Sequence, residues 1–134
     1  MKKSLDAAAI ALTSLFLLAF FVYSARGLFV PQLTSARFFG LPVAGGVGAL
    51  YYRVYLSRNL VIVIAGLIFL VRRQWQPLAI VTTLAIALPL FDAVILFHEL
   101  GHGALLTFHV AAFVVIALAS TLLWLRVRNA KRAA

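Results

Sequence analysis

The sequence contains no cysteine, and only three of its 134 residues are acidic. The absence of cysteine excludes disulfide bonds, thiolate metal sites and cysteine nucleophiles. The shortage of acids leaves a net charge of +9, because twelve lysines and arginines face only Asp6, Asp92 and Glu99. In a soluble protein this charge would suggest nucleic-acid binding. Here the basic residues flank long apolar runs, so the pattern indicates a membrane protein with no nucleic-acid partner.

Charged surface is also too scarce for a soluble domain, since 65% of the residues are hydrophobic and 11% are charged. Four apolar runs are long enough to cross a bilayer, which takes about 20 helical residues. The runs lack the period-two alternation of barrel strands. The predicted fold is therefore all-α, a four-transmembrane-helix bundle forming one membrane domain over residues 1–134. The predicted spans are about 6–24, 48–71, 78–97 and 104–126.

The positions of the basic residues predict the orientation of the bundle. Eight basic residues lie near the ends of the spans on the side of the termini, and only Arg26 and Arg37 lie near the ends on the other side. Both termini are therefore expected in the cytoplasm, and the composition suggests a bacterial inner membrane. The long connection between the first two spans predicts a short interfacial helix near residues 34–41, ended by Gly40 and Pro42.

His98, Glu99 and His102 spell H-E-x-x-H, the pattern that places two zinc ligands and a general base on one helix. A protease is disfavoured, because Asp92 is about 120° around a continuous helix from His98 and cannot share the metal. One helix from 78 to 126 would also be about 73 Å long, so the chain is expected to turn at Gly101 and Gly103. The motif is therefore expected to be a polar turn. The alternative is a site for zinc or another divalent metal, with His98, His102 and His109 as ligands.

Ionisable side chains inside membrane spans are costly unless they are paired or line a cavity. We expect Asp92 to pair with Arg53 or Arg58, with Pro89 kinking the third span just before it. The three later spans should converge on this pair, and the first should pack alongside through Ala7, Ala8, Ala9 and Ala11. The predicted intramembrane polar pocket, near the outer leaflet, consists of Arg53, Tyr55, Arg58, Asn59, Asp92 and His109.

Three short motifs resemble the small four-helix membrane family DUF4267, and more distantly the DoxX-like membrane proteins. They are Phe-Gly-Leu-Pro at residues 39–42, Arg58-Asn59 in the second span, and Pro89 with Asp92 in the third. The resemblance covers about residues 10–125. It implies a four-helix integral membrane protein and supplies no activity.

Three classes of function remain open from the sequence. The first is a membrane protein whose pocket binds a lipid or small apolar ligand, as a homo-oligomer or a subunit of a larger membrane complex. The second is a small isomerase or cyclase-like proton-transfer enzyme, with Asp92, His109 and Glu99 as candidate catalytic residues. The third is metal binding at residues 98–102.

Overall fold

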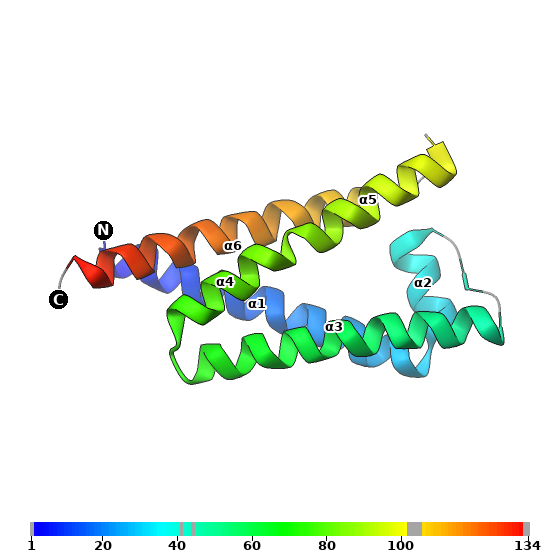
Figure 1. Ribbon diagram of the computed structural model, residues 1–134, viewed down its shortest axis with the longest axis horizontal. Coiled ribbons are helices and arrows are strands. Elements are labelled where there is room, and N and C mark those ends of the chain that lie inside the picture. Colours follow the sequence, from blue (N-terminus) through cyan, green and yellow to red (C-terminus); the bar gives the residue numbers. More distant parts are fainter. Residues whose placement is uncertain (1, 41, 44, 102–105, 133–134) are drawn as a thin grey trace.

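All regular structure is helical in the part of the chain that the computed structural model describes, residues 2–40, 42–43, 45–101 and 106–132. Six helices follow one another along the chain (Figure 1). They are α1 (Lys2–Phe29), α2 (Pro31–Phe39), α3 (Val47–Val71), α4 (Trp75–Ala85), α5 (Ala87–Leu100) and α6 (Thr107–Lys131).

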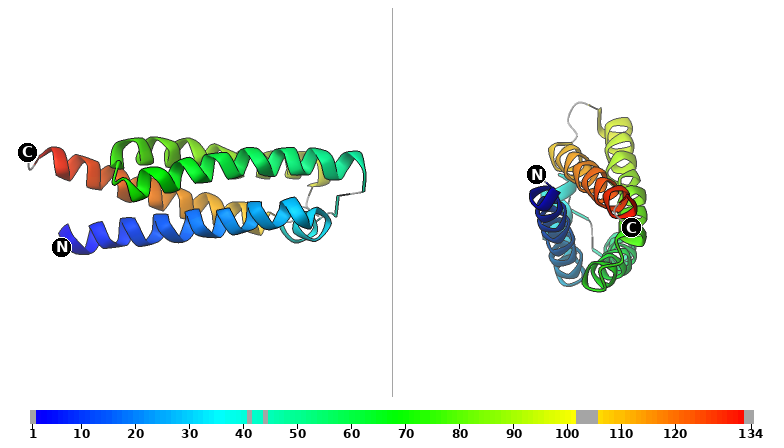
Figure 2. Two further views of the ribbon diagram at one scale, coloured as in Figure 1. Left: turned by 90° about the horizontal axis from the view of Figure 1, so that it is seen from below. Right: turned by 90° about the vertical axis from the view of Figure 1, so that its left-hand side faces the viewer.

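Four segments are long and apolar enough to cross a membrane, which confirms the predicted four-span, all-α fold. They are Ser4–Phe29, Val47–Val71, Trp75–Leu100 and Thr107–Lys131. The first extends five residues beyond its predicted end, because Gly27 continues α1 instead of ending it. The spans run along one long axis, and α1 begins at the same end of the bundle at which α6 finishes (Figures 1 and 2).

The third span is broken near its middle, as Pro89 predicts. Helix α4 ends at Ala85 and α5 begins at Ala87, with Ile86 between them. Proline has no N–H to donate to the carbonyl of the residue four positions earlier, which here is Ala85. The break separates the two halves of the span and lies six residues, about one and a half turns, before Asp92.

The first span packs more centrally than predicted. Helix α1 packs against both α3 and α6, while α4 and α5 pack against α6. Its inward face is a narrow stripe that includes Ala9, Thr13 and Leu17, which are all buried. Of the four alanines expected at this interface only Ala9 is buried, because Ala7, Ala8 and Ala11 point away from the stripe. The expected contact through all four alanines is therefore wrong.

Helix α2 is the predicted short helix between the first two spans, and it lies across the bundle axis, packed against α1 and α3 (Figures 1 and 2). It begins at Pro31, which suits the first turn of a helix, and Gly40 ends it in the left-handed conformation with φ 74°. The Ser35 hydroxyl accepts a hydrogen bond from the Val43 N–H at 2.8 Å. This bond ties the following loop back to α2 and helps hold α2 across the end of the bundle.

Candidate functional site

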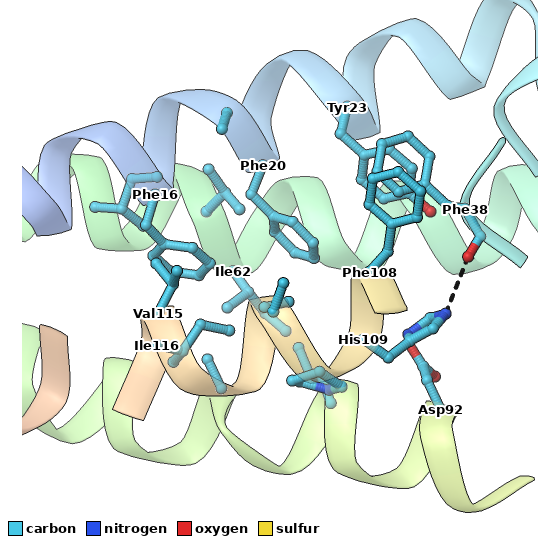
Figure 3. Close-up of a pocket in the computed structure, with 18 of the residues that line it drawn as sticks. Phe16, Phe20, Tyr23, Phe38, Ile62, Asp92, Phe108, His109, Val115 and Ile116 are labelled. Atoms are coloured by element: carbon cyan, nitrogen blue, oxygen red, sulfur yellow. Dashed lines mark hydrogen bonds and ion pairs between the residues drawn. The ribbon is translucent and has the colours of Figure 1, made fainter. Parts of the chain in front are cut away.

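A cavity of about 410 Å³ lies inside the bundle, and all six described helices contribute to its wall. Most of the lining side chains are aliphatic or aromatic. Figure 3 shows Phe16, Val115 and Ile116 toward one end, and Asp92 with His109 at the other. We call this space the apolar cavity, and its end at Asp92 and His109 the polar end.

Asp92 is held at the polar end by side chains from two other helices. The Tyr55 hydroxyl, on α3, donates a hydrogen bond to Asp92 Oδ2 at 3.2 Å. His109, on α6, places Nδ1 3.6 Å from the same oxygen. The carboxyl of α5 is thereby joined to both α3 and α6, so each of the last three spans supplies one polar group to the site.

The contacts of His109 suit a proton between the imidazole and Asp92. His109 Nε2 lies 3.1 Å from the carbonyl oxygen of Phe38. A carbonyl oxygen only accepts, so Nε2 carries a proton and donates. In a neutral imidazole Nδ1 would then be a bare acceptor facing another acceptor, the Asp92 carboxylate. One additional proton, on His109 as an imidazolium or on Asp92 as a carboxylic acid, would make this contact favourable.

Aromatic rings from α1 and α2 cover the polar end. Phe38 packs at a tilt against Tyr23 with ring centroids 4.3 Å apart, and the Phe39 ring lies 5.0 Å from the His109 ring. Tyr23 in turn shares a hydrogen bond with Tyr52, with the two hydroxyl oxygens 3.0 Å apart. The side chain of His109 is thereby left 8% exposed and that of Asp92 23% exposed, so an unpaired charge on either would be costly within the membrane.

Of the six residues predicted for the pocket, the structure places Tyr55, Asp92 and His109 together on the apolar cavity. Asn59 is buried in the interior face of α3 but does not line the cavity. Their roles in binding or catalysis stay predictions. Phe38 and Tyr23 were not predicted, although the Phe38-Phe39 pair near a short crossing helix was a visible signal for an aromatic cover.

The predicted pairing of Asp92 with Arg53 or Arg58 is wrong. Both arginines are exposed and outside the cavity, and Arg53 Nε instead donates to the Leu28 carbonyl at 3.0 Å. At 100° per residue, Arg53 lies roughly 90° to one side of the centre of the buried stripe of α3, and Arg58 roughly 130° to the other side. That stripe consists of Ala49, Tyr52, Leu56, Asn59, Val63 and Gly66. Helix α5 also moves away from α3 with distance from the turn that joins α3 to α4 (Figure 1). The contact of α3 with Asp92 is made by the hydroxyl of Tyr55.

His98 and Glu99 lie at the end of α5, away from the apolar cavity. Their side chains are 83% and 69% exposed and contact each other at 3.2 Å. Gly101 ends the helix with φ 60°, as expected for a turn here. His102 lies outside the described residues, and within the described ones no three His, Asp or Glu side chains gather into a metal-binding group. Metal binding by His98, His102 and His109, and a catalytic role for Glu99, stay predictions.

A family model described as a domain of unknown function, DUF4267, matches residues 18–123 of the chain. The chain belongs to this family. The match includes every polar residue of the cavity named above, so Tyr23, Tyr55, Asp92 and His109 are all part of the DUF4267 domain. No curated protein matches the chain, and no solved structure does.

Proposed function

We propose that this DUF4267 protein binds a small, mainly apolar membrane molecule in the apolar cavity, with one polar group of the ligand beside Asp92. The supporting observation is the composition of the cavity wall, which is apolar except for a few polar groups and has Asp92 and His109 at one end. Ligand sites commonly measure about 300–1,000 Å³ and combine an apolar wall with a few placed polar groups. A cavity of about 410 Å³ is within that range.

The hydrogen bonds at the polar end favour a ligand group that can donate. Within the described chain both contacts of Asp92 use Oδ2, which leaves Oδ1 free to accept. With one proton beyond the neutral imidazole, the pair of Asp92 with His109 would be neutral as a whole. A hydroxyl or amide group of the ligand therefore fits better than a second charge, which would lack a counterion.

The position of the cavity supports entry from the lipid. Leu15 lines the cavity and is 67% exposed on the outer surface of the bundle. In a four-span membrane protein this surface faces acyl chains. A lipid-soluble molecule could then enter sideways, without passing through water.

A pair of neighbouring valines on α6 tests this function. Val115 lines the cavity, whereas Val114 is 47% exposed and does not. The expected ligand is a molecule that is enriched in the wild-type protein relative to total membrane lipid. In Val115→Phe the larger ring should occupy the space of the ligand, so this molecule should be at least tenfold less abundant than in wild type. In Val114→Phe it should be retained. The measurement is quantitative mass spectrometry of organic extracts of the three proteins, purified identically in mild detergent. Equal enrichment in all three, or no enriched molecule in wild type, would contradict the proposal.

The approach of His109 Nδ1 to Asp92 Oδ2, at 3.6 Å, favours proton transfer as a second candidate function. A carboxyl–imidazole pair beside a cavity can move a proton on a bound molecule. Asn at position 92 retains hydrogen-bonding capacity but cannot release a proton. Asp92→Asn protein should therefore still bind the extracted molecule. Isomerisation of that molecule by wild type and not by Asp92→Asn would show that the protein is an enzyme. If wild type does not convert the molecule, the proton-transfer function is ruled out and the binding function remains.

We further propose that the protein lies in a bacterial cytoplasmic membrane, with the start of α1 and the end of α6 in the cytoplasm. The excess of basic residues at that end of the bundle supports this orientation. The chain has no cysteine, so single cysteines can report each side. Glu99→Cys should react with a membrane-impermeant maleimide in intact spheroplasts, and Ala130→Cys only after lysis. The reverse pattern would overturn the orientation.

A further inference from the structure

A second pocket, of about 430 Å³, lies at the opposite end of the bundle from Asp92. It is lined by Ile10, Leu70, Arg73, Trp75 and Arg126, and we call it the arginine pocket. It stands where the spans Val47–Val71 and Trp75–Leu100 meet, which is the depth of the lipid headgroups in a spanning protein. We propose that the arginine pocket binds the phosphate of an anionic phospholipid between Arg73 and Arg126, with the first carbons of the acyl chains against Ile10 and Leu70.

The backbone of Arg73 is the first observation behind this proposal. Helix α3 ends in a pair of hydrogen bonds, from Gln74 N to Phe69 O at 2.8 Å and from Arg73 N to Leu70 O at 3.1 Å. This arrangement requires a left-handed residue after the helix end, and glycine is the usual choice. Here the residue is Arg73, with φ 54°, the one described non-glycine residue with positive φ. The turn alone would be formed with less strain by glycine. The presence of arginine at this position is therefore better explained by a role of its side chain.

Arg126 supplies the second half of the site and is already fixed in place. Its guanidinium lies 4.1 Å over the Trp75 ring, and Nη1 forms an ion pair with Asp6 at 3.0 Å. Its side chain is still 20% exposed. The guanidinium is therefore oriented by two neighbours, and its accessible N–H groups can donate to a phosphate oxygen.

The charge around the pocket favours a phosphate over a neutral headgroup. Asp6 is the acidic residue at this end of the chain and is paired with Arg126. Arg73 has no ion-pair partner in the part of the chain that the structure describes, and Arg72 and Arg128 add positive charge nearby in the sequence. The tryptophan beside the pocket suits the interface, where amphipathic rings gather at headgroup level. A phosphodiester with apolar chains matches both the charge and the apolar lining.

Quenching of Trp75 by brominated lipids tests the proposal directly. The chain has two tryptophans, so Trp124→Phe leaves Trp75 as the single reporter. In vesicles of phosphatidylcholine with brominated phosphatidylglycerol, the anionic lipid should quench Trp75 with an apparent affinity at least threefold that of brominated phosphatidylcholine. Arg73→Gln in this background should bring the ratio close to one. Arg72→Gln removes the same charge from the neighbouring residue, which does not line the pocket, and should keep most of the preference.

Three results would overturn the proposal. Equal quenching by the two lipids in the Trp124→Phe protein would show that the pocket does not select an anionic headgroup. Equal losses in Arg72→Gln and Arg73→Gln would show a diffuse basic surface instead of a site. Relief of quenching by millimolar inorganic phosphate, but not by sodium chloride of equal ionic strength, would make free phosphate the ligand instead of a lipid.

Arg73→Gly separates this role from a role in folding. Glycine adopts φ 54° without strain, so the variant should unfold in neutral detergent at the wild-type temperature or a few degrees above it. The same variant should lose the preference for phosphatidylglycerol. A variant that is less stable than wild type and keeps the lipid preference would show that Arg73 acts on the turn, and the proposal would fail.

Discussion

Asp92→Ala should lower the free energy of unfolding by about 3 kcal/mol, within the range for breaking one side of a buried ion pair. The substitution leaves the Tyr55 hydroxyl and His109 Nδ1 without their shared partner, Asp92 Oδ2. It also leaves His109 fixed by its bond to the Phe38 carbonyl, so the ring cannot turn to a new partner without losing that bond. Equilibrium unfolding in mixed micelles of increasing dodecyl sulfate content measures the change.

Two matched variants show whether the pair is the cause. Asp92→Asn retains a group that can donate to both His109 Nδ1 and the Tyr55 oxygen, and should cost less than half as much as alanine. Glu99→Ala removes a carboxylate from the same helix whose side chain is 69% exposed, and should change stability by no more than about 0.5 kcal/mol. A cost for Asp92→Ala as small as that of Glu99→Ala would show that Asp92 is not held as described.

Gly27→Leu should destabilise the bundle by about 3 kcal/mol, at the upper end of the usual cost of overpacking a core. A β-carbon at Gly27 would overlap Leu56 Cδ1 and lie 3.2 Å from Thr34 Cγ2. Leu56 is completely buried, so it has no space into which to move. The glycine therefore permits the close approach of α1 to α3, as small residues do between membrane helices.

Gly48→Leu is the control for Gly27→Leu, because a β-carbon at Gly48 meets nothing within 4 Å. This glycine lies in the first turn of α3, where leucine should leave stability unchanged or raise it by about 0.5 kcal/mol through helix propensity. The same micelle titration compares the two variants. Similar losses for both would mean that α1 and α3 do not pack closely at Gly27.

The four spans, the short crossing helix and the break in the third span could be predicted because each depends on local chemistry. Apolar length sets the spans, while Gly40 and Gly101 adopt the positive φ angles at which two of the helices end. Pro89 removes a backbone donor whatever surrounds it. Each of these features is determined by a short stretch of sequence, and together they determine the fold.

The pairing of the buried charges could not be predicted in the same way, because it depends on how the helices are rotated and arranged. Depth along a span follows from residue number, and it correctly placed Asp92 near Tyr55 and His109. It also placed Arg53 and Arg58 nearby, but their side of α3 follows only from packing with α1. Nothing in the sequence indicated that a backbone carbonyl of α2 would reach His109. Placing that carbonyl requires the fold of the whole connection between the first two spans.

The central claim is that the apolar cavity holds a membrane molecule whose polar group meets Asp92. The most direct test is a crystal structure of protein that is purified with its native lipids and crystallised from a lipidic mesophase. We predict elongated density between Phe16 and Ile116, ending within hydrogen-bond distance of Asp92 Oδ1. A cavity closed by the side chains of α1 and α6, or Asp92 turned outward to lipid and apart from His109, would contradict the account.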